Sequence, residues 1–475
     1  MAGLGVCLTA GQFDLVVAAN RLPVDVTVEP DGTVTTGRSP GGLVAAMEPV
    51  LRQHQGAWVG WPGAADLTFA PVTTDGVTSF PVALTTQEIE EYYEGFANAT
   101  LWPLYHDVIT PPRYHREWHA AYKTVNQRFA WAVAQVAAEG ATVWVHDYQL
   151  QLVPGMIREL RPDVRIGFFN HIPFPPEALF AQLPWRREIL MGLLGADLLG
   201  FQRPQDAANF RSCVRRLAGL TTRSQFIAVP TNGGGHRQVQ VGAFPISIDS
   251  SAADALARSP KVQARAREIR AELGNPDTVL FGVDRLDYTK GIPHRLKAYE
   301  ELLREGRLPM PGVVLVQVAS PSRANVTAYQ QLRDEVETTV GRIMGDFGNL
   351  GSPVIHYLHQ NQGPEEMAAL YLASDVMVVT ALRDGMNLVA KEYIAARVDG
   401  RGTLVLSEFT GAADELRQAL LINPHDIEGL KSTLVRAVSM SPREQRRRMR
   451  ALRRRVMTQD VATWAGAFLG ALGDW

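Results

Sequence analysis

Two cations stand close together after a predicted strand in the second half of the chain. The segment 281–291 (FGVDRLDYTKG) leaves an apolar run and enters a helical pattern, which places Arg285 and Lys290 in one loop. Paired cations suit a leaving diphosphate, because negative charge grows on its oxygen as the bond to it breaks. An ordinary Arg–Asp surface pair is the alternative interpretation. Because Arg285 and Lys290 lie at the carboxyl end of a predicted strand, we favour the interpretation that they bind a diphosphate.

A second strand-to-helix junction, 381–392 (ALRDGMNLVAKE), carries further polar groups. The backbone amides of Leu388 and Val389 fall at the predicted helix start, where they can cap a phosphate. Asp384 is placed to accept sugar hydroxyls, and Glu392, one turn along the helix, is placed to reach a ribose. In the alternative interpretation Asp384 is a helix cap and Glu392 pairs with a lysine.

Paired glycines mark another possible anion site near the start of the chain. In 38–43 (RSPGGL) Gly42 opens a predicted helix, and glycines there let backbone amides approach an anion closely. A simple turn is the alternative. The patterns GxGxxG and GxxxxGK[ST] are both missing from the sequence. Their absence counts against a nucleotide-dependent dehydrogenase and a P-loop enzyme.

Four histidines call for interpretation. His146 and His171 each follow a predicted strand, and each is either a general base or a hydrogen-bonded structural histidine. His115 and His119 are four residues apart on a predicted helix and resemble half of a zinc site. The sequence offers no evident third ligand, so we expect no zinc there.

The elements that position these residues are short apolar strands alternating with helices. The predicted strands are Leu15–Ala19, Thr142–Val145, Arg165–Asn170, Val239–Ala243, Val279–Val283, Val313–Ala319, Val354–Leu358, Val376–Thr380 and Thr403–Ser407. The clearest predicted helices are Gly42–Gln53, Ala328–Met344, Pro364–Ala373 and Asn387–Arg397. This alternation predicts parallel sheets covered by helices, in an α/β protein of two doubly wound domains. The pattern of strands and helices restarts near 242–249, where we expect the boundary between the domains. We expect ligands to bind at the carboxyl ends of the strands, in a cleft between the two domains.

The composition of the chain limits the kinds of partner that it can bind and the cellular compartment that we expect for it. The chain has 475 residues, a formal net charge of -2 and two cysteines without a CxxC partner. We see no signal peptide, and the most apolar stretch, 189–201, is too short to cross a bilayer. We therefore expect a cytoplasmic protein that binds neither membrane nor nucleic acid. The Arg-rich stretch 443–455 fits a helix with a basic outer face, with Met449, Leu452 and Val456 turned inward.

Six segments in order along the chain resemble the trehalose-6-phosphate synthases, glycosyltransferase family 20. They are 19–23 (ANRLP), 91–103 (EYY through LWP), 145–150 (VHDYQL), 171–175 (HIPFP), 284–291 (DRLDYTKG) and 382–392 (LRDGMNLVAKE). The resemblance implies a GT-B fold with Rossmann-like domains at 1–244, completed by a C-terminal helix 456–475, and at 245–455. It implies transfer of glucose with retention of configuration from UDP- or GDP-glucose to glucose 6-phosphate.

Roles for individual residues follow from the same resemblance. Arg21, Tyr93, Trp102 and Arg323 would hold the acceptor's phosphate, and Asp147 its sugar hydroxyls. Arg285 and Lys290 would bind the donor diphosphate, assisted by Gly42 and the amides of Leu388 and Val389. His171 and Asp384 would bind the donor glucose, and Glu392 the ribose. No Asp-x-Asp pair occurs in the sequence, so we expect neither a metal nor another cofactor.

One departure from the family pattern concerns the nucleotide base. Gln362 stands where better-known members carry an aromatic residue, and with Asn361 it offers the amide groups that guanine recognition needs. Backbone groups such as those of Val318 would suffice for uracil. In the alternative interpretation, the side chains of Asn361 and Gln362 are solvated in a loop and do not contact the base. A pseudo-glycosyltransferase joining cyclitol units and a non-catalytic sugar-phosphate sensor are the rival functions, and a homo-oligomer is possible.

Overall fold

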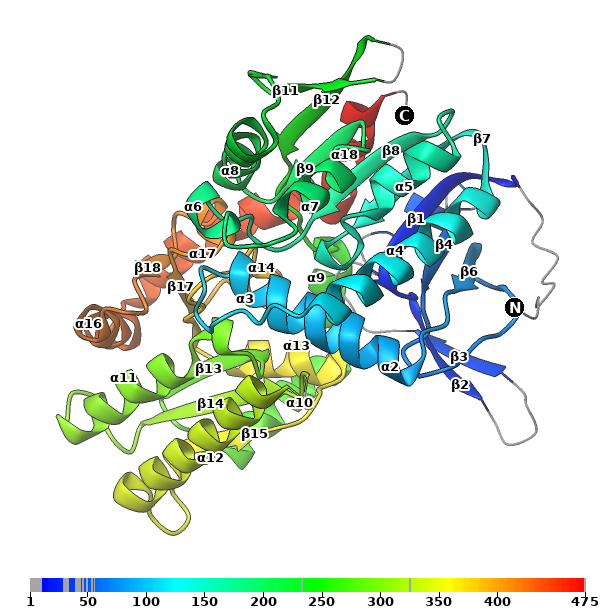
Figure 1. Cartoon of the computed structure of the whole chain (residues 1–475). Coiled ribbons are helices and arrows are strands. Elements are labelled where there is room, and N and C mark those ends of the chain that lie inside the picture. Colours follow the sequence, from blue (N-terminus) through cyan, green and yellow to red (C-terminus); the bar gives the residue numbers. More distant parts are fainter. Residues whose placement is uncertain are drawn as a thin grey trace. The chain divides into compact units, whose positions relative to one another are not determined.

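The chain folds into two compact units of α/β structure (Figure 1). The computed structural model describes residues 11–28, 34–38, 44, 47, 50–52, 54, 56–231, 234–323 and 326–473. Unit 1 comprises Met1–Pro245 and Ala462–Trp475, and unit 2 comprises Ile246–Val461. Val456, expected to begin the segment that returns to the first domain, instead lies within a continuous helix of unit 2.

Unit 1 is built on a ten-stranded sheet in the order β10-β11-β12-β9-β8-β7-β1-β4-β6-β5. Pairing is parallel from β12 to β6 and antiparallel at both edges. A separate antiparallel hairpin consists of β2 (Val24–Val28) and β3 (Val34–Arg38). The strands of the large sheet are β1 (Phe13–Arg21), β4 (Ala57–Trp61), β5 (Val72–Thr74), β6 (Val77–Pro81), β7 (Ala137–His146), β8 (Arg165–Asn170), β9 (Leu198–Phe201), β10 (Thr222–Arg223), β11 (Phe226–Pro230) and β12 (His236–Ala243).

The strand order of unit 1 reverses between β1 and β7. The chain builds β4 and β6 on one side of β1, and then β7, β8, β9 and β12 on the other. Such a switch point opens a crevice at the carboxyl ends of the two central strands. Here those ends are Arg21 and His146.

Helices cover this sheet, and the last of them comes from the far end of the sequence. Phe468 of α18 lies against β8 and β9, where a Cβ on Gly167 or Gly200 would come within 2.7 Å or 2.6 Å of its ring. Figure 1 shows α18 in red beside these green strands. The helices of unit 1 are α2 (Thr86–Glu88), η1 (Ile89–Leu101), α3 (Trp102–Tyr105), α4 (Arg116–Val136), η2 (Tyr148–Leu150), α5 (Val153–Leu160), α6 (Glu177–Phe180), α7 (Arg186–Leu193), α8 (Pro204–Cys213), η3 (Val214–Ala218) and, from Ala462 on, α18 (Val461–Leu472).

Unit 2 contains a six-stranded, all-parallel sheet in the order β15-β14-β13-β16-β17-β18. Its first strand, β13, is central, and the order reverses between β13 and β16, as in a dinucleotide-binding fold. The two-domain α/β fold expected from the sequence is therefore confirmed. The strands are β13 (Thr278–Arg285), β14 (Val313–Ser320), β15 (Ile355–Leu358), β16 (Val376–Val379), β17 (Thr403–Ser407) and β18 (Leu420–Ile422).

Side chains alternate between two covered faces of this sheet. Leu280 joins a core with α11, α12 and α16, whereas the ring of Phe281 lies 5.9 Å from that of Tyr371 on α13. Burial on both faces explains the uninterrupted apolar strands. The helices of unit 2 are α9 (Ser250–Arg258), α10 (Pro260–Glu272), η4 (Tyr288–Lys290), α11 (Ile292–Arg304), α12 (Thr327–Phe347), α13 (Pro364–Ala373), α14 (Leu388–Ala396), α15 (Ala412–Glu415), α16 (Ile427–Val438) and α17 (Pro442–Thr458).

The Arg-rich stretch lies on α17, with Met449, Leu452 and Val456 buried as predicted. Its arginines make local ion pairs, including Arg455 with Glu415 at 2.9 Å. No helix among the described residues is both long enough and apolar enough to cross a membrane.

Candidate functional site

An ion pair occupies the switch point of unit 2. Lys290 follows β13 and Asp384 follows β16, and Lys290 Nζ lies 2.6 Å from Asp384 Oδ2. Only 10% of the lysine side chain and 15% of the carboxylate side chain are exposed. Asn387 Nδ2 donates to the same carboxylate oxygen at 3.2 Å. The structure thus brings two sequence-predicted residues together at the carboxyl end of the sheet.

The loop that carries Lys290 is fixed by its own residues and by β16. Asp287 Oδ1 accepts hydrogen bonds from the backbone and hydroxyl of Thr289, at 2.9 and 2.8 Å. Gly291 has φ +63°, and a Cβ there would come within 2.1 Å of the carbonyl oxygen of Thr380. The hydroxyl of Thr380 donates to the carbonyl of Gly291 at 3.0 Å. Only glycine permits this close approach, so the sequence Thr-Lys-Gly sets where the lysine lies.

Asp287 links this loop to Arg323. Arg323 Nη1 lies 2.8 Å from Asp287 Oδ2, and the guanidinium also contacts Tyr329, whose ring centroid is 5.4 Å away. Burial opposes ionisation of Asp287, but the charges of Arg323, Arg285 and Lys290 outweigh it and lower the pKa of this carboxyl. Arg285 itself is exposed at the end of β13. Three cations therefore surround one buried carboxylate, a contact that the sequence analysis did not anticipate although Asp287 lies within the DRLDYTKG segment.

The start of α14 presents backbone amides at the same end of the sheet. Asn387, with φ +88°, caps the helix by accepting from the amide of Ala390 at 3.0 Å. The interpretation of Asp384 as the cap is therefore wrong. Leu388 and Val389 supply the first amides of the helix, as expected.

Glu392 lies one turn further along α14. Its Oε2 accepts from the hydroxyl of Tyr371 at 2.8 Å, so a tyrosine is its partner here, where a lysine had been the alternative. Burial raises the pKa of the Glu392 carboxyl.

The residues assigned to the nucleotide base are on and after neighbouring strands. Val318 lies inside β14, and its carbonyl accepts from Gln317 Nε2 at 2.9 Å. Asn361 is exposed and Gln362 half-buried in the loop that follows β15. His359 Nδ1 lies 3.0 Å from the carbonyl oxygen of Ala319 and so ties this loop to β14.

In unit 1, Arg21 at the end of β1 lies over the ring of Trp61. Its guanidinium carbon lies 5.1 Å from the centroid of Trp61, whose ring lies 5.6 Å from that of Tyr93. Gly63, at φ +104°, leaves room for the guanidinium, since a Cβ there would come within 2.2 Å of Arg21 Nη2. Two of the predicted phosphate residues, Arg21 and Tyr93, thus both contact Trp61, which the sequence analysis missed.

Asp147 and His171 meet at the ends of β7 and β8, and Trp102, the first residue of α3, lies beside the residue that follows Asp147. Asp147 adopts φ +72°, a left-handed conformation uncommon for aspartate, and its Oδ1 accepts from the backbone amide of His171 at 3.1 Å. The ring of Trp102 lies 5.6 Å from that of Tyr148, the next residue after Asp147. Strained backbone held at a strand end is typical of functional sites.

His171 also faces His146. His171 Nε2 lies 3.0 Å from His146 Nδ1, and His146 is fully buried. Burial lowers the pKa of His171 to about 3, and burial together with His171 lowers the pKa of His146 well below its ordinary value. Both imidazoles are therefore neutral near pH 7.

The remaining histidine pair and the acidic clusters have local partners. His119 Nε2 lies 3.2 Å from Glu188 Oε2, and its ring stacks on Trp185 at 4.4 Å, while His115 contacts Trp118. Within the described ranges, one group of three acidic side chains has the spacing of metal ligands, and it surrounds the ammonium of Lys431. Its members are Glu301, Glu305 and Glu428.

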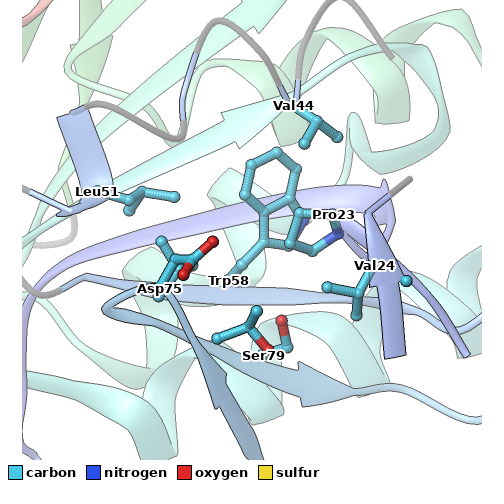
Figure 2. A pocket seen from close by; sticks show the side chains of 10 residues that line it. Pro23, Val24, Val44, Leu51, Trp58, Asp75 and Ser79 are labelled. Atoms are coloured by element: carbon cyan, nitrogen blue, oxygen red, sulfur yellow. The ribbon is translucent and has the colours of Figure 1, made fainter. Parts of the chain in front are cut away.

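A small cavity of about 70 Å³ in unit 1 lies apart from these residues (Figure 2). Figure 2 shows Trp58 among Pro23, Val24 and Val44, with Asp75 and Ser79 nearby. Its described lining has no arginine or lysine and so does not suit a phosphate. Trp58 Nε1 donates to the carbonyl of Arg21 at 2.9 Å, so this wall supports the backbone at the end of β1. Gly42, a predicted anion ligand, lies outside the described residues.

Comparison with known proteins gives one consistent result. The family model described as glycosyltransferase family 20 matches residues 14–474. A Mycobacterium avium (strain 104) protein named trehalose-6-phosphate synthase is 59% identical over 472 residues, which cover 98% of this chain and 96% of its own. A Mycobacterium tuberculosis (strain ATCC 25618 / H37Rv) protein of the same name is 58% identical over 476 residues, covering 98% and 95%.

Solved structures agree with these relatives. The E. coli protein bound with UDP-2-fluoro glucose has a TM-score of 0.87 at 35% identity, covering 96% of this chain and 98% of its own. An alpha,alpha-trehalose-phosphate synthase (UDP-forming) from Burkholderia xenovorans in complex with glucose-6-phosphate has a TM-score of 0.87 at 34% identity, covering 96% and 99%.

Proposed function

Since the chain belongs to glycosyltransferase family 20, we propose that it transfers glucose, with retention of configuration, from a nucleoside-diphosphate glucose to glucose 6-phosphate. The product is trehalose 6-phosphate. The observation that carries this proposal is the Lys290–Asp384 pair at the switch point of unit 2. A site that binds a nucleotide sugar needs a cation for the diphosphate and a carboxylate for the sugar hydroxyls. Here Lys290 and Asp384 supply the two groups side by side.

The donor side follows from the loops of unit 2. Lys290 and the exposed Arg285 bind the diphosphate, and the first amides of α14 complete its contacts. Asp384 binds hydroxyls of the donor glucose, and Glu392, steadied by Tyr371, binds the ribose. Gly42 is a further proposed ligand. Negative charge that develops on the departing diphosphate is stabilised by charges already in place, which lowers the barrier.

The acceptor side follows from the switch point of unit 1. Arg21, stacked on Trp61 beside Tyr93, binds the phosphate of glucose 6-phosphate. Trp102 and, from unit 2, Arg323 are further proposed phosphate residues. Asp147 accepts sugar hydroxyls of the acceptor, and His171 binds the donor glucose. Catalysis then consists of positioning the two sugars and of electrostatic stabilisation of an oxocarbenium-like state, with the leaving phosphate accepting the acceptor's proton.

The deciding experiment is incubation of purified protein with glucose 6-phosphate and each nucleoside-diphosphate glucose in turn. Formation of trehalose 6-phosphate with an α,α linkage supports the proposal. Binding of both substrates without turnover would instead indicate a sensor, and a product formed only from cyclitols would indicate a pseudo-glycosyltransferase. We further propose a cytoplasmic location, to be tested by fractionation, and self-association, to be tested by sedimentation.

A further inference from the structure

The imidazoles of His146 and His171 in unit 1 lie within hydrogen-bond distance of each other. His146 Nδ1 and His171 Nε2 are 3.0 Å apart, and the ring centroids are 5.2 Å apart with planes inclined at 29°. Both rings are neutral near pH 7, because burial lowers both pKa values. A neutral imidazole carries one N–H, so one ring must donate in this contact and the other must accept.

The surroundings of His146 decide which ring donates. Its other nitrogen, Nε2, is buried and has no hydrogen-bond partner among the described residues. If His171 donated, His146 would have to carry its proton on Nε2, as a buried N–H with no acceptor. If His146 donates through Nδ1, its Nε2 is a bare lone pair. Buried unpaired N–H groups are the rarer and costlier case, so donation by His146 is favoured.

The tautomer of His171 follows directly. Its Nε2 accepts from His146, so its own proton lies on Nδ1. We propose that His146 is a positioning residue that holds His171 in the Nδ1–H form, which makes His171 a fixed hydrogen-bond donor toward an oxygen of the substrate and not a general base. The inference rests on the proposed function for the identity of that oxygen, a hydroxyl of the donor glucose.

Neighbouring groups hold both rings in place. The backbone amide of His171 donates to Asp147 Oδ1 at 3.1 Å, which fixes the main chain that carries this ring. The ring of His146 lies 4.8 Å from Trp144, and the ring of His171 lies 4.7 Å from Phe169. Aromatic neighbours of this kind restrict the rotation of both imidazole rings.

The tautomer can be observed directly. We would record long-range ¹H–¹⁵N spectra of the full-length protein labelled with ¹⁵N-histidine, and assign His171 by its loss in His171→Asn. The parent should show His171 protonated on Nδ1, and His146→Leu should show a mixture of both tautomers. A parent spectrum with His171 protonated on Nε2 would overturn the inference.

Activity supplies a second, independent measurement. Asparagine and leucine have nearly the same size, but only asparagine offers an N–H near the position of Nδ1. We expect His146→Leu to raise KM for the nucleotide sugar by about fivefold to tenfold, and His146→Asn to stay close to the parent. An equal increase in KM in both variants would show that His146 only fills space. His119→Asn, which removes another buried imidazole of unit 1, is the control and should change KM little.

The spectra do not depend on turnover. If His171 is the Nδ1–H tautomer but no nucleoside-diphosphate glucose reacts, the tautomer assignment stands and the proposed function fails.

Discussion

Lys290 and Asp384 are 94 positions apart in the sequence, yet their side chains meet at 2.6 Å because β13 and β16 are neighbours in the sheet. An ammonium group has three donors, so a bond to Asp384 leaves donors for a diphosphate. The carboxylate in turn gives this poorly exposed lysine a partner of opposite charge. Each residue thus supports the other's proposed role.

Replacing either member of this pair should have a large and coupled effect. We expect Lys290→Ala and Asp384→Asn each to lower kcat/KM by about a hundredfold or more. The fold-loss of kcat/KM in the double variant should be smaller than the product of the two single fold-losses, because the side chains contact each other. Steady-state kinetics of the four proteins measure this coupling. Lys261→Ala, which breaks an exposed pair with Glu365 at 2.6 Å, should leave the kinetics unchanged.

Arg285 is expected to act on the leaving group. Arg285→Ala should lower kcat by about a hundredfold, the scale for loss of one preorganised charged donor. Single-turnover measurements with a nucleoside-diphosphate glucose and glucose 6-phosphate test this. Arg333→Ala removes an exposed arginine that pairs with Glu337 at 2.8 Å and serves as the control. Near-normal kcat in Arg285→Ala would refute the assignment.

Loss of Arg21 should weaken selection of the phosphorylated acceptor. A charge-assisted, bidentate contact contributes about 2 kcal/mol or more, so Arg21→Ala should reduce the preference for glucose 6-phosphate over glucose by about thirtyfold. Trp61→Leu should produce a smaller loss, because it removes only the stacking partner. The measurement is the ratio of kcat/KM for the two acceptors.

Arg323→Ala should lower the same preference and also destabilise unit 2. Asp287 would lose the partner at 2.8 Å that helps to keep it ionised, and an unpaired buried carboxylate is costly. Tyr329→Phe removes a hydroxyl that contacts Asp287 at 3.1 Å but retains the arginine. It should therefore destabilise without changing acceptor preference. If Arg323→Ala retains the parent's preference, the phosphate binds elsewhere.

The loop after β15 is expected to read the nucleotide base. If Asn361 and Gln362 recognise guanine, GDP-glucose should be a good donor and Asn361→Ala should lower its kcat/KM several-fold more than that of UDP-glucose. Donor competition with both nucleotides measures this. A strong preference for UDP-glucose that the substitution leaves unchanged would show that these amides do not contact the base.

Acid should destabilise the protein through the His146–His171 pair before carboxylates titrate. The folded-state pKa of His171 is about 3, against about 6.5 when unfolded, and that of His146 is also lowered. Below pH 6.5 the unfolded chain binds protons that the folded chain excludes, so stability falls as pH falls, by at most about 1.4 kcal/mol per pH unit for each group. Urea unfolding of His146→Asn/His171→Asn between pH 6.5 and 5 should show a shallower slope than the parent.

Long apolar runs between helical segments predicted the sheets well, and Arg165–Asn170 and Thr403–Ser407 match β8 and β17 in full. Other strands were missed. β4 (AWVGW) contains a glycine and two tryptophans, and its pairing with β1 depends on residues 40 or 41 positions earlier. Propensity over five residues cannot reveal such a partner.

The candidate site, like the fold, was predicted only in part. Motifs at strand ends identified residues that the fold brings together, such as Lys290 with Asp384 and Asp147 with His171. The engagement of Arg323 by Asp287 was not predictable, because it depends on side-chain packing across the ends of β13 and β14. The contacts of Trp61 with Arg21 and Tyr93 were missed for the same reason.

The placement of α18 has a consequence for biosynthesis. Unit 2 is a continuous stretch of chain, whereas unit 1 takes its last helix from after it. Phe468 covers β8 and β9 at Gly167 and Gly200, and the ring of Trp464 lies 5.0 Å from that of Phe169 on β8. Trp464 Nε1 also donates to the carbonyl of Phe244 at 3.2 Å. During translation, the ribosome completes unit 2 while this apolar surface of unit 1 is still bare. A premature stop shortly before α18 therefore leaves a nascent protein with one finished unit and one that exposes glycine-lined strands to chaperones and proteases.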